Sequence, residues 1–217
     1  MFLNKVITNF RQYGFMGLAW RVVKKVFRLV GVSYDSYYYL ACELDYKELA
    51  ARWEANSLKD VRQLSLADYE HGDPAYFTEE KMEILSDRFQ HDNYLAYGAF
   101  EGERLVYSAM ISLEEMCFPT PEVSGTLDEH ECLICDVYCD PDRRGKGYHN
   151  RMTVYLLMKG YEKGYRRAVT TVLKENKPSH KSFVKAGFSI KFSFYTLCIG
   201  GKSYTNYYKK KNKYASR

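Results

Sequence analysis

The residues best suited to bind a charged ligand form one run, Arg144-Gly145-Lys146-Gly147-Tyr148-His149. It follows an alternating apolar run, Leu133 to Cys139, and precedes an apolar-rich run without proline, Met152 to Tyr161. Glycines let the backbone come close to a ligand, and the N–H groups of a helix's first turn attract anions. Because Arg143, Arg144 and Lys146 add positive charge, the sequence predicts a phosphate-binding loop between a strand and a helix.

The elements around this loop predict a mixed α/β domain. Strands are expected over 61–66, 94–100, 105–112, 133–139, 167–173, 188–199 and 203–208. Asp45 is expected to open a short helix that carries Leu49 and Trp53, and a helical region is expected to begin near Asp68. Further helices are expected over 78–89, from near Gly147 to Gly160 or Gly164, and over 176–186. Glu114 to Glu131 forms a long connection with two prolines and a glycine. The order of strands and helices argues against a doubly wound sheet.

The N-terminal part is expected to be a helical extension. The segment from Gly17 to Val30 spaces Arg21, Lys24, Lys25 and Arg28 along one helical face and fills the rest with apolar residues. Such a helix could lie in a membrane interface, or its apolar face could cover the domain or a partner. We therefore divide the chain into a basic amphipathic extension (1–60), a mixed α/β domain (61–208) and a basic tail (209–217). The aromatic run from Tyr34 to Leu44 indicates no definite element.

Charge is distributed unevenly along the 217 residues. The segments 1–34 and 202–217 hold twelve of the 32 Lys and Arg residues and no acid, which leaves 20 bases against 27 acids between them. Basic ends suit an anionic membrane surface or another polyanion, or they simply keep the protein soluble. No signal peptide and no apolar run long enough to span a bilayer is visible. Because the thiols are expected to be reduced, we expect a cytoplasmic protein, with peripheral contact at the inner face of the membrane as an open alternative.

The cysteines indicate no metal site. Cys132 and Cys135 have a spacing seen in zinc sites, but residues three apart in a strand point to opposite faces. Alternation places Cys135 and Cys139 on one apolar face with Leu133 and Val137, and Ile134, Asp136 and Tyr138 on the other. We expect reduced, structural thiols.

Two motifs make the chain resemble the GNAT superfamily of acyl-coenzyme A dependent N-acyltransferases, over about residues 61–208. The superfamily's pyrophosphate loop, R/Q-x-x-G-x-G/A after a proline, is similar to Arg144–His149 with Pro141 in place. A second pattern is similar to Asn176, Phe183 and Gly187-Phe188, and Val61–Leu64 resembles the first strand. A dinucleotide-binding loop fits less well, because Asn150 stands where its third glycine belongs. The resemblance implies a mixed, predominantly antiparallel sheet flanked by helices.

The sequence departs from this family at two positions. His149 puts an imidazole where the loop usually ends in a small residue; it would donate a hydrogen bond to a phosphate or point away from the loop. Phe183 occupies the place of a tyrosine that protonates the departing thiolate, and a phenyl ring cannot do so. A thiol with a pKa near ~8.5 is a tolerable leaving group without an acid, so turnover would be slowed rather than lost.

The resemblance also implies roles for site residues. Backbone N–H groups of Arg144, Gly145, Lys146, Gly147, Tyr148 and His149 would hold the pyrophosphate, and main-chain groups of Val137, Tyr138 and Cys139 would pair with the pantetheine arm and polarise the thioester. Asn176 and Phe183 complete the expected coenzyme site. Asp136 is the first candidate general base, directly or through water, and a purely structural role is an equal alternative. His130, His149 and His180 are further candidates.

We therefore expect an acetyl-CoA dependent N-acetyltransferase that acts on a primary amine of a small molecule, such as an amino sugar, without a metal. The alternative is a catalytically silent acyl-CoA binding module docked to a membrane or partner through its basic ends. Nucleic-acid binding by the tail is less well supported, because no recognition motif accompanies the charge. A homodimer is left open.

Overall fold

The computed structural model describes residues 22–114, 127–200 and 202–208. It divides the chain into two compact units, Met1–Ala41 with Thr171–Arg217, and Cys42–Thr170. The predicted mixed α/β class, with a mostly antiparallel sheet flanked by helices, is confirmed. Three predicted segments lie wholly or partly outside the described residues: the tail at 209–217, most of the connection at 114–131, and residues 17–21 of the predicted helix. The division of the chain at residues 60 and 208 stays a prediction.

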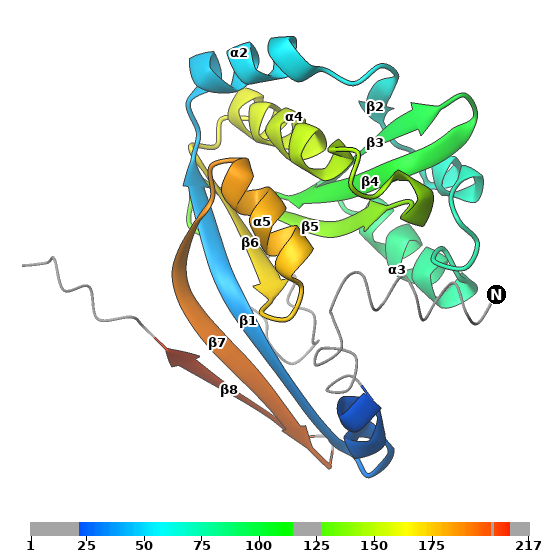
Figure 1. The fold of residues 1–217 in the computed structure, drawn as a ribbon, viewed down its shortest axis with the longest axis vertical. Helices are drawn as coiled ribbons and strands as arrows, with labels where there is room; N and C mark the ends of the chain where they lie inside the picture. The colour runs from blue at the N-terminus through cyan, green and yellow to red at the C-terminus, as the bar shows by residue number, and fades with distance from the viewer. Residues whose placement is uncertain (1–21, 115–126, 201, 209–217) are drawn as a thin grey trace, which may run out of the picture. The chain divides into compact units, whose positions relative to one another are not determined.

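The second unit is built on a sheet with the strand order β2-β3-β4-β5-β6 (Figure 1). Its strands are β2 (Val61–Gln63), β3 (Tyr94–Glu101), β4 (Arg104–Ser112), β5 (Glu131–Cys139) and β6 (Arg167–Leu173). The last three residues of β6 belong to the first unit. Neighbours from β2 to β5 are antiparallel, and β5 and β6 are parallel from Glu131↔Arg167 to Leu133↔Val169. The single parallel pair joins only the start of β5 to β6, so the end of β5 that leads into the phosphate-binding loop lies beyond this ladder.

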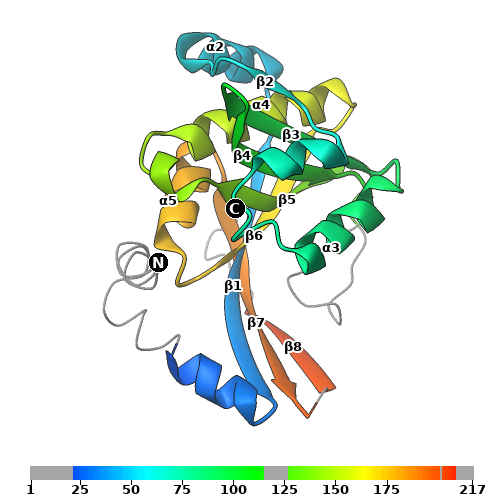
Figure 2. The ribbon, with the colours of Figure 1, turned by 90° about the vertical axis from the view of Figure 1, so that its right-hand side faces the viewer.

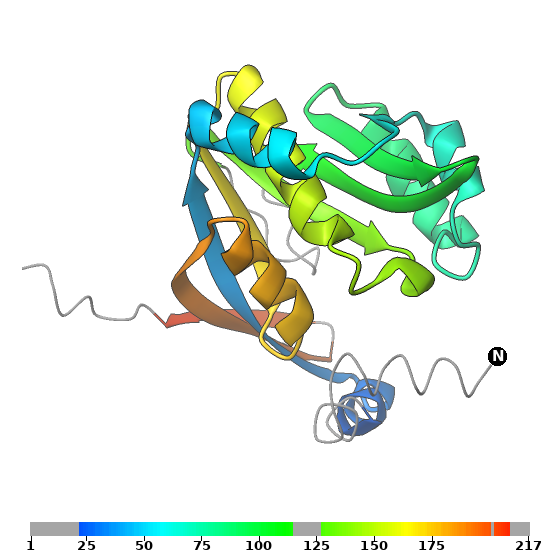
Figure 3. The same ribbon diagram turned by 45° about the horizontal axis from the view of Figure 1, so that its top comes forward.

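Helices cover both faces of this sheet. They are α2 (Tyr46–Asn56), the 3₁₀ turn η1 (Leu66–His71), α3 (Glu79–Phe89), the short turn η2 (Pro141–Arg143) and α4 (Tyr148–Glu162). The predicted caps are present, because Asp45 accepts from the backbone of Lys47 and Glu48, and Thr78 from that of Lys81. α4 lies on one face, with α2 beside it (Figure 3), and α3 lies on the other (Figure 2).

The first unit contains β1 (Val32–Glu43), β7 (Ser189–Ile199), β8 (Lys202–Tyr208), α5 (Lys177–Lys185) and a helix over 22–29. β1 pairs antiparallel with β7, and β7 with β8. Stacked rings join the first pair, with centroids 5.1 Å apart for Tyr37 and Phe194 and 4.5 Å apart for Tyr39 and Phe192. The aromatic run left unassigned from the sequence is therefore a strand.

No helix within the described ranges is long and apolar enough to cross a membrane.

Candidate functional site

The predicted phosphate-binding loop is anchored to β4 at its start. Asp140, whose side chain is 1% exposed, accepts a hydrogen bond from the backbone N–H of Asp142 at 2.8 Å and pairs with Arg104 at 2.6 Å. Gly145 and Gly147 follow with φ angles of +79° and +82°. Because side chains with a Cβ adopt such angles at a cost, both glycines are required by the path of the backbone.

The loop ends at the N-terminus of α4, which suits an anion. Gly147 is the N-cap and offers no side-chain hydrogen bond, and the first turn contains no acidic residue. Arg151 adds a positive charge that is held beside the loop, because its Nη2 donates a hydrogen bond to the carbonyl of Lys146 at 2.8 Å. The N–H groups of the first turn, the helix dipole and the charges of Lys146 and Arg151 fit a pyrophosphate group.

Arg143 contributes less to this site than its charge suggests. Its guanidinium pairs with Glu101 at the end of β3 at 2.6 Å, and the hydroxyl of Tyr148 donates to the same carboxylate. The hydrogen bond from Arg143 lowers the pKa of Glu101. Arg143 and Tyr148 therefore tie the loop to the β3–β4 hairpin, and the charge of Arg143 is balanced by Glu101.

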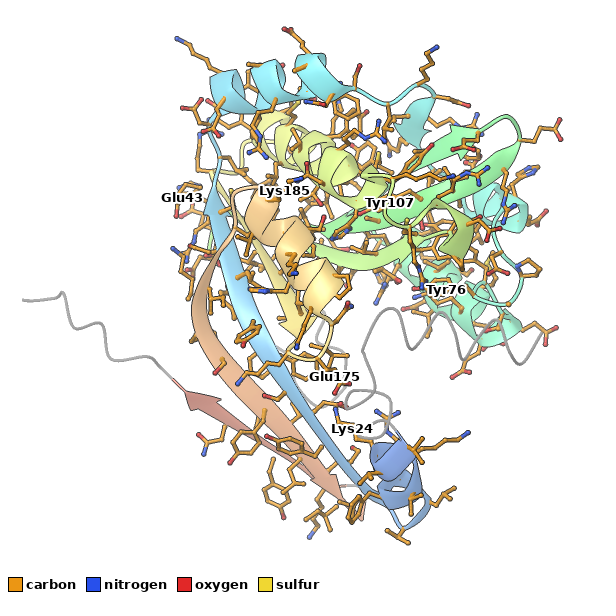
Figure 4. The ribbon with its side chains drawn as sticks, in the orientation of Figure 1. Lys24, Glu43, Tyr76, Tyr107, Glu175 and Lys185 are labelled. Carbon is orange, nitrogen blue, oxygen red and sulfur yellow. The ribbon has the colours of Figure 1, made fainter. Side chains whose placement is uncertain are left out.

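The His149 side chain turns toward β4. Its Nδ1 lies 2.9 Å from the hydroxyl of Tyr107, a residue with no exposed surface; Figure 4 labels Tyr107 on β4. Burial lowers the pKa of His149 to about 4, so the ring is neutral at pH 7. Of the two orientations considered from the sequence, the structure shows the one in which the ring points away and the loop's N–H groups are left to a ligand.

A β-bulge interrupts β5 just before the predicted thioester-binding strand residues. Met110 pairs with Cys135 and Ser108 with Tyr138, so β5 has one residue more than β4 across this interval. Asp136 takes up the extra residue with φ +52°, a conformation that Asp tolerates better than most residues.

The bulge corrects the predicted alternation along β5. Cys135 and Tyr138 pack in the same apolar cluster as Leu85 of α3, and Asp136 also points to α3, whereas Cys139 is paired opposite Tyr107 on the α4 side. The prediction that Cys135 and Cys139 share a face, with Asp136 and Tyr138 opposite, is therefore wrong. Strict alternation fails because the extra residue inverts the facing of every later side chain.

Two cations of α3 hold the Asp136 carboxylate. Lys81 Nζ lies 2.5 and 2.6 Å from its two oxygens, and Arg88 Nη1 pairs with Oδ2. The Asp136 side chain is only 8% exposed. Little of this carboxylate is therefore accessible to a substrate.

Aromatic rings border this ion-paired group. The Tyr76 and Tyr138 ring centroids lie 4.7 Å apart, and Lys81 Nζ is 6.0 Å from the Tyr76 ring. Burial, followed by the charge of Asp136, raises the pKa of Tyr76, so its phenol is protonated at neutral pH. Figure 4 labels Tyr76 beside α3.

The backbone of Val137 to Cys139 lies beyond the end of the ladder between β5 and β6. That ladder stops at Leu133↔Val169 within the described part of the chain. The Cys139 carbonyl accepts from Arg144 Nε at 3.2 Å. A pantetheine arm that paired with this carbonyl would share it with the Arg144 side chain or replace that side chain.

The remaining predicted residues lie mostly in the first unit. Asn176 caps α5, where its side chain accepts from the backbone of Ser179 at 3.3 Å, and Phe183 is buried at 2% exposure with its ring 5.1 Å from that of Phe188. His180 lies beside Tyr38, with ring centroids 5.1 Å apart. His130, in the second unit, is exposed, and its carbonyl accepts from Arg166 and Arg167.

Sequence reasoning missed several residues that shape the loop and the bulge: Tyr76, Lys81, Arg88, Tyr107 and Arg151. Lys81 and Arg88 are seven residues apart on a helix and therefore share a face, but nothing in the sequence pairs that face with Asp136. The position of Arg151, four residues after Gly147, could have been recognised as the end of the first turn of α4.

Comparison with known proteins identifies the family and the fold. The family model described as "Acetyltransferase (GNAT) family" matches residues 58–188. Among solved structures, an acetyltransferase from the GNAT family of Colwellia psychrerythraea is similar, with a TM-score of 0.54, 10% identity, and coverage of 89% of this chain and 62% of that chain. A functionally unknown conserved protein from Staphylococcus epidermidis has a TM-score of 0.53, 12% identity, and coverage of 82% and 66% respectively.

At these identities the two solved structures show a shared fold, and this chain spans less than two thirds of the length of each. No curated protein matches the sequence. The family model covers more than half of the 217 residues. The chain belongs to the acetyltransferase (GNAT) family.

Proposed function

We propose that this acyltransferase moves an acetyl group from acetyl-CoA to a primary amine of a small molecule. The observation that carries the proposal is the loop from Arg144 to His149, with two left-handed glycines, an uncapped helix N-terminus and no acid in the first turn. Bound acetyl-CoA would supply the activated thioester. Backbone N–H groups of the loop would hold its pyrophosphate, with Lys146 and Arg151 balancing the charge.

The pantetheine arm is proposed to pair with the main chain of Val137, Tyr138 and Cys139, on the side of β5 that extends past its ladder with β6. Asn176 and Phe183 remain proposed coenzyme contacts from the family pattern. In the transfer, the amine nitrogen bonds to the acetyl carbonyl carbon, the carbon–sulfur bond breaks, the nitrogen loses a proton and the thiolate gains one.

Asp136 remains the proposed proton acceptor. The two ion pairs that hold it mean that a substrate amine would share the carboxylate with Lys81 and Arg88. The same ion pairs, together with Phe183 in place of the usual tyrosine, favour the second candidate function, an acyl-CoA binding module without turnover.

The experiment is to incubate the full chain with acetyl-CoA and a panel of small primary amines, amino sugars included, and to search for acetylated product by mass spectrometry. An N-acetylated product with one acetyl group per coenzyme consumed supports transfer. Saturable coenzyme binding without product from any amine supports the silent module.

A further inference from the structure

The helix over residues 22–29 turns its basic side toward its own unit. Lys24 Nζ lies 2.8 Å from Asp35 and 3.1 Å from Glu175, and the Lys24 side chain is only 10% exposed. Arg28 pairs with the other oxygen of Asp35 at 3.2 Å. Figure 4 shows Lys24 and Glu175 pointing toward each other. These ion pairs fix which side of the helix faces outward.

The outward side is apolar. Val22, Val23, Val26, Phe27, Leu29 and Val30 are between 40% and 81% exposed. The β7–β8 turn lies beside the end of this helix, because Gly200 N donates to the Gly31 carbonyl at 3.0 Å, and it adds Ile199 at 48% exposure; Figure 1 shows the turn and the helix together. We call these seven residues the apolar tip. A contiguous patch of this kind indicates a binding surface rather than scattered exposed residues.

The charges around the apolar tip are positive. Lys24 and Arg28 are balanced by Asp35 and Glu175, which leaves Lys25 on the helix and Lys202 after the turn as exposed cations. Between residues 22 and 34 the sequence contains no acid. Apolar side chains bordered by lysines match a bilayer with anionic headgroups, because the side chains enter the headgroup boundary while the lysines meet phosphates.

We propose that the apolar tip docks on an anionic lipid bilayer. The proposal concerns the first unit alone and does not depend on acetyl transfer. It accounts for an amphipathic helix in which Lys24 and Arg28 pair with acids of their own unit while the apolar residues face outward, an arrangement that the sequence pattern alone did not predict.

The test is cosedimentation of the full chain with vesicles of phosphatidylcholine and phosphatidylglycerol (3:1), against vesicles of phosphatidylcholine alone. The test variant is Phe27→Ser with Leu29→Ser. The control, Ile84→Ser with Val184→Ser, also changes two exposed apolar residues, at 43% and 47% against 51% for Phe27 and 81% for Leu29, and they lie on α3 and α5. Neither variant alters net charge, so only the apolar contribution differs.

We expect the wild type to bind anionic vesicles at least tenfold more strongly than neutral ones, the test variant to lose at least tenfold in partitioning, and the control to stay within twofold of the wild type. Equal binding of test and control variants would overturn the proposal and leave only charge adsorption. A wild type that ignores anionic vesicles would also overturn it. In that case two further measurements show what covers the apolar tip. If light scattering finds the wild type oligomeric and the test variant monomeric, a second copy of the chain covers it. If the Tm of the test variant is lower than that of the wild type, residues of the same chain cover it.

Discussion

Lys81 of α3 binds both carboxylate oxygens of Asp136, the residue at the bulge in β5, with its Nζ at 2.5 and 2.6 Å from them. The Asp136 backbone has φ +52°, and Arg88 binds the same carboxylate. The contact therefore joins the helix on one face of the sheet to the strand segment that precedes Val137–Cys139. Because Asp136 both forms the ion pairs and has the left-handed backbone of the bulge, a substitution at Asp136 affects both features.

Replacing Asp136 with Asn should lower both stability and turnover. Asn leaves Lys81 and Arg88 without a counter-charge, and loss of one partner of a buried pair costs roughly 3 kcal/mol or more. Urea unfolding measures this change. If Asp136 also accepts the amine proton, kcat falls and its pH dependence flattens. Asp142→Asn, at a side chain that is 73% exposed, is the control. A loss of stability with an unchanged pH profile would remove Asp136 from proton transfer.

Replacing Gly145 with Ala should weaken coenzyme binding about tenfold, or about 1.4 kcal/mol. Gly145 has φ +79° and open space around its Cα, so the substitution changes the backbone path without a clash. Gly102→Ala is a matched control, with φ +61° and the same open space in the β3–β4 hairpin. Both should cost about 1 to 2 kcal/mol of stability, but only Gly145→Ala should weaken acetyl-CoA binding in calorimetry. Equal affinities for both variants would contradict the assignment of the loop.

His149 should make stability depend on pH between about 6.5 and 4. Its pKa in the folded chain is about 4, below the usual value near ~6.5. As the pH falls through this window, His149 is protonated in the unfolded chain but stays neutral in the folded chain. Protonation therefore stabilises the unfolded chain, and the free energy of unfolding falls by up to about 3 kcal/mol.

The difference between wild type and His149→Gln isolates this effect from that of the carboxylates. Denaturation at pH 7.5 and pH 4.5 should show a smaller loss in the variant. Tyr107→Phe removes the hydrogen-bond partner at 2.9 Å but keeps the imidazole, so it should retain the pH dependence. Parallel losses in wild type and His149→Gln would show that the imidazole is not buried as described.

Much of the fold could be predicted because local signals agreed with it. Asp45 and Thr78 mark the starts of α2 and α3 as N-caps, and the strand predicted over Arg167 to Leu173 is β6 with the same bounds. β1 was missed because its aromatic residues lie on both faces and therefore show no alternation of polar and apolar side chains.

The site was predicted less completely, because its decisive contacts join residues distant in sequence. The glycine loop is local and was found. The face of the sheet to which Asp136 points depends on a bulge in the pairing of β5 with β4. Its partners Lys81 and Arg88 come from a helix about 50 residues earlier in the chain. Likewise, the orientation of His149 depends on Tyr107, which a local pattern cannot reveal.

Acetyl transfer to an amine can be measured as steady release of free thiol from acetyl-CoA, followed with a thiol reagent across the amine panel. We expect multiple turnovers with at least one amine, at a rate that saturates with amine concentration and falls in Gly145→Ala but not in Gly102→Ala. Tight acetyl-CoA binding with no thiol release above the amine-free rate would contradict it.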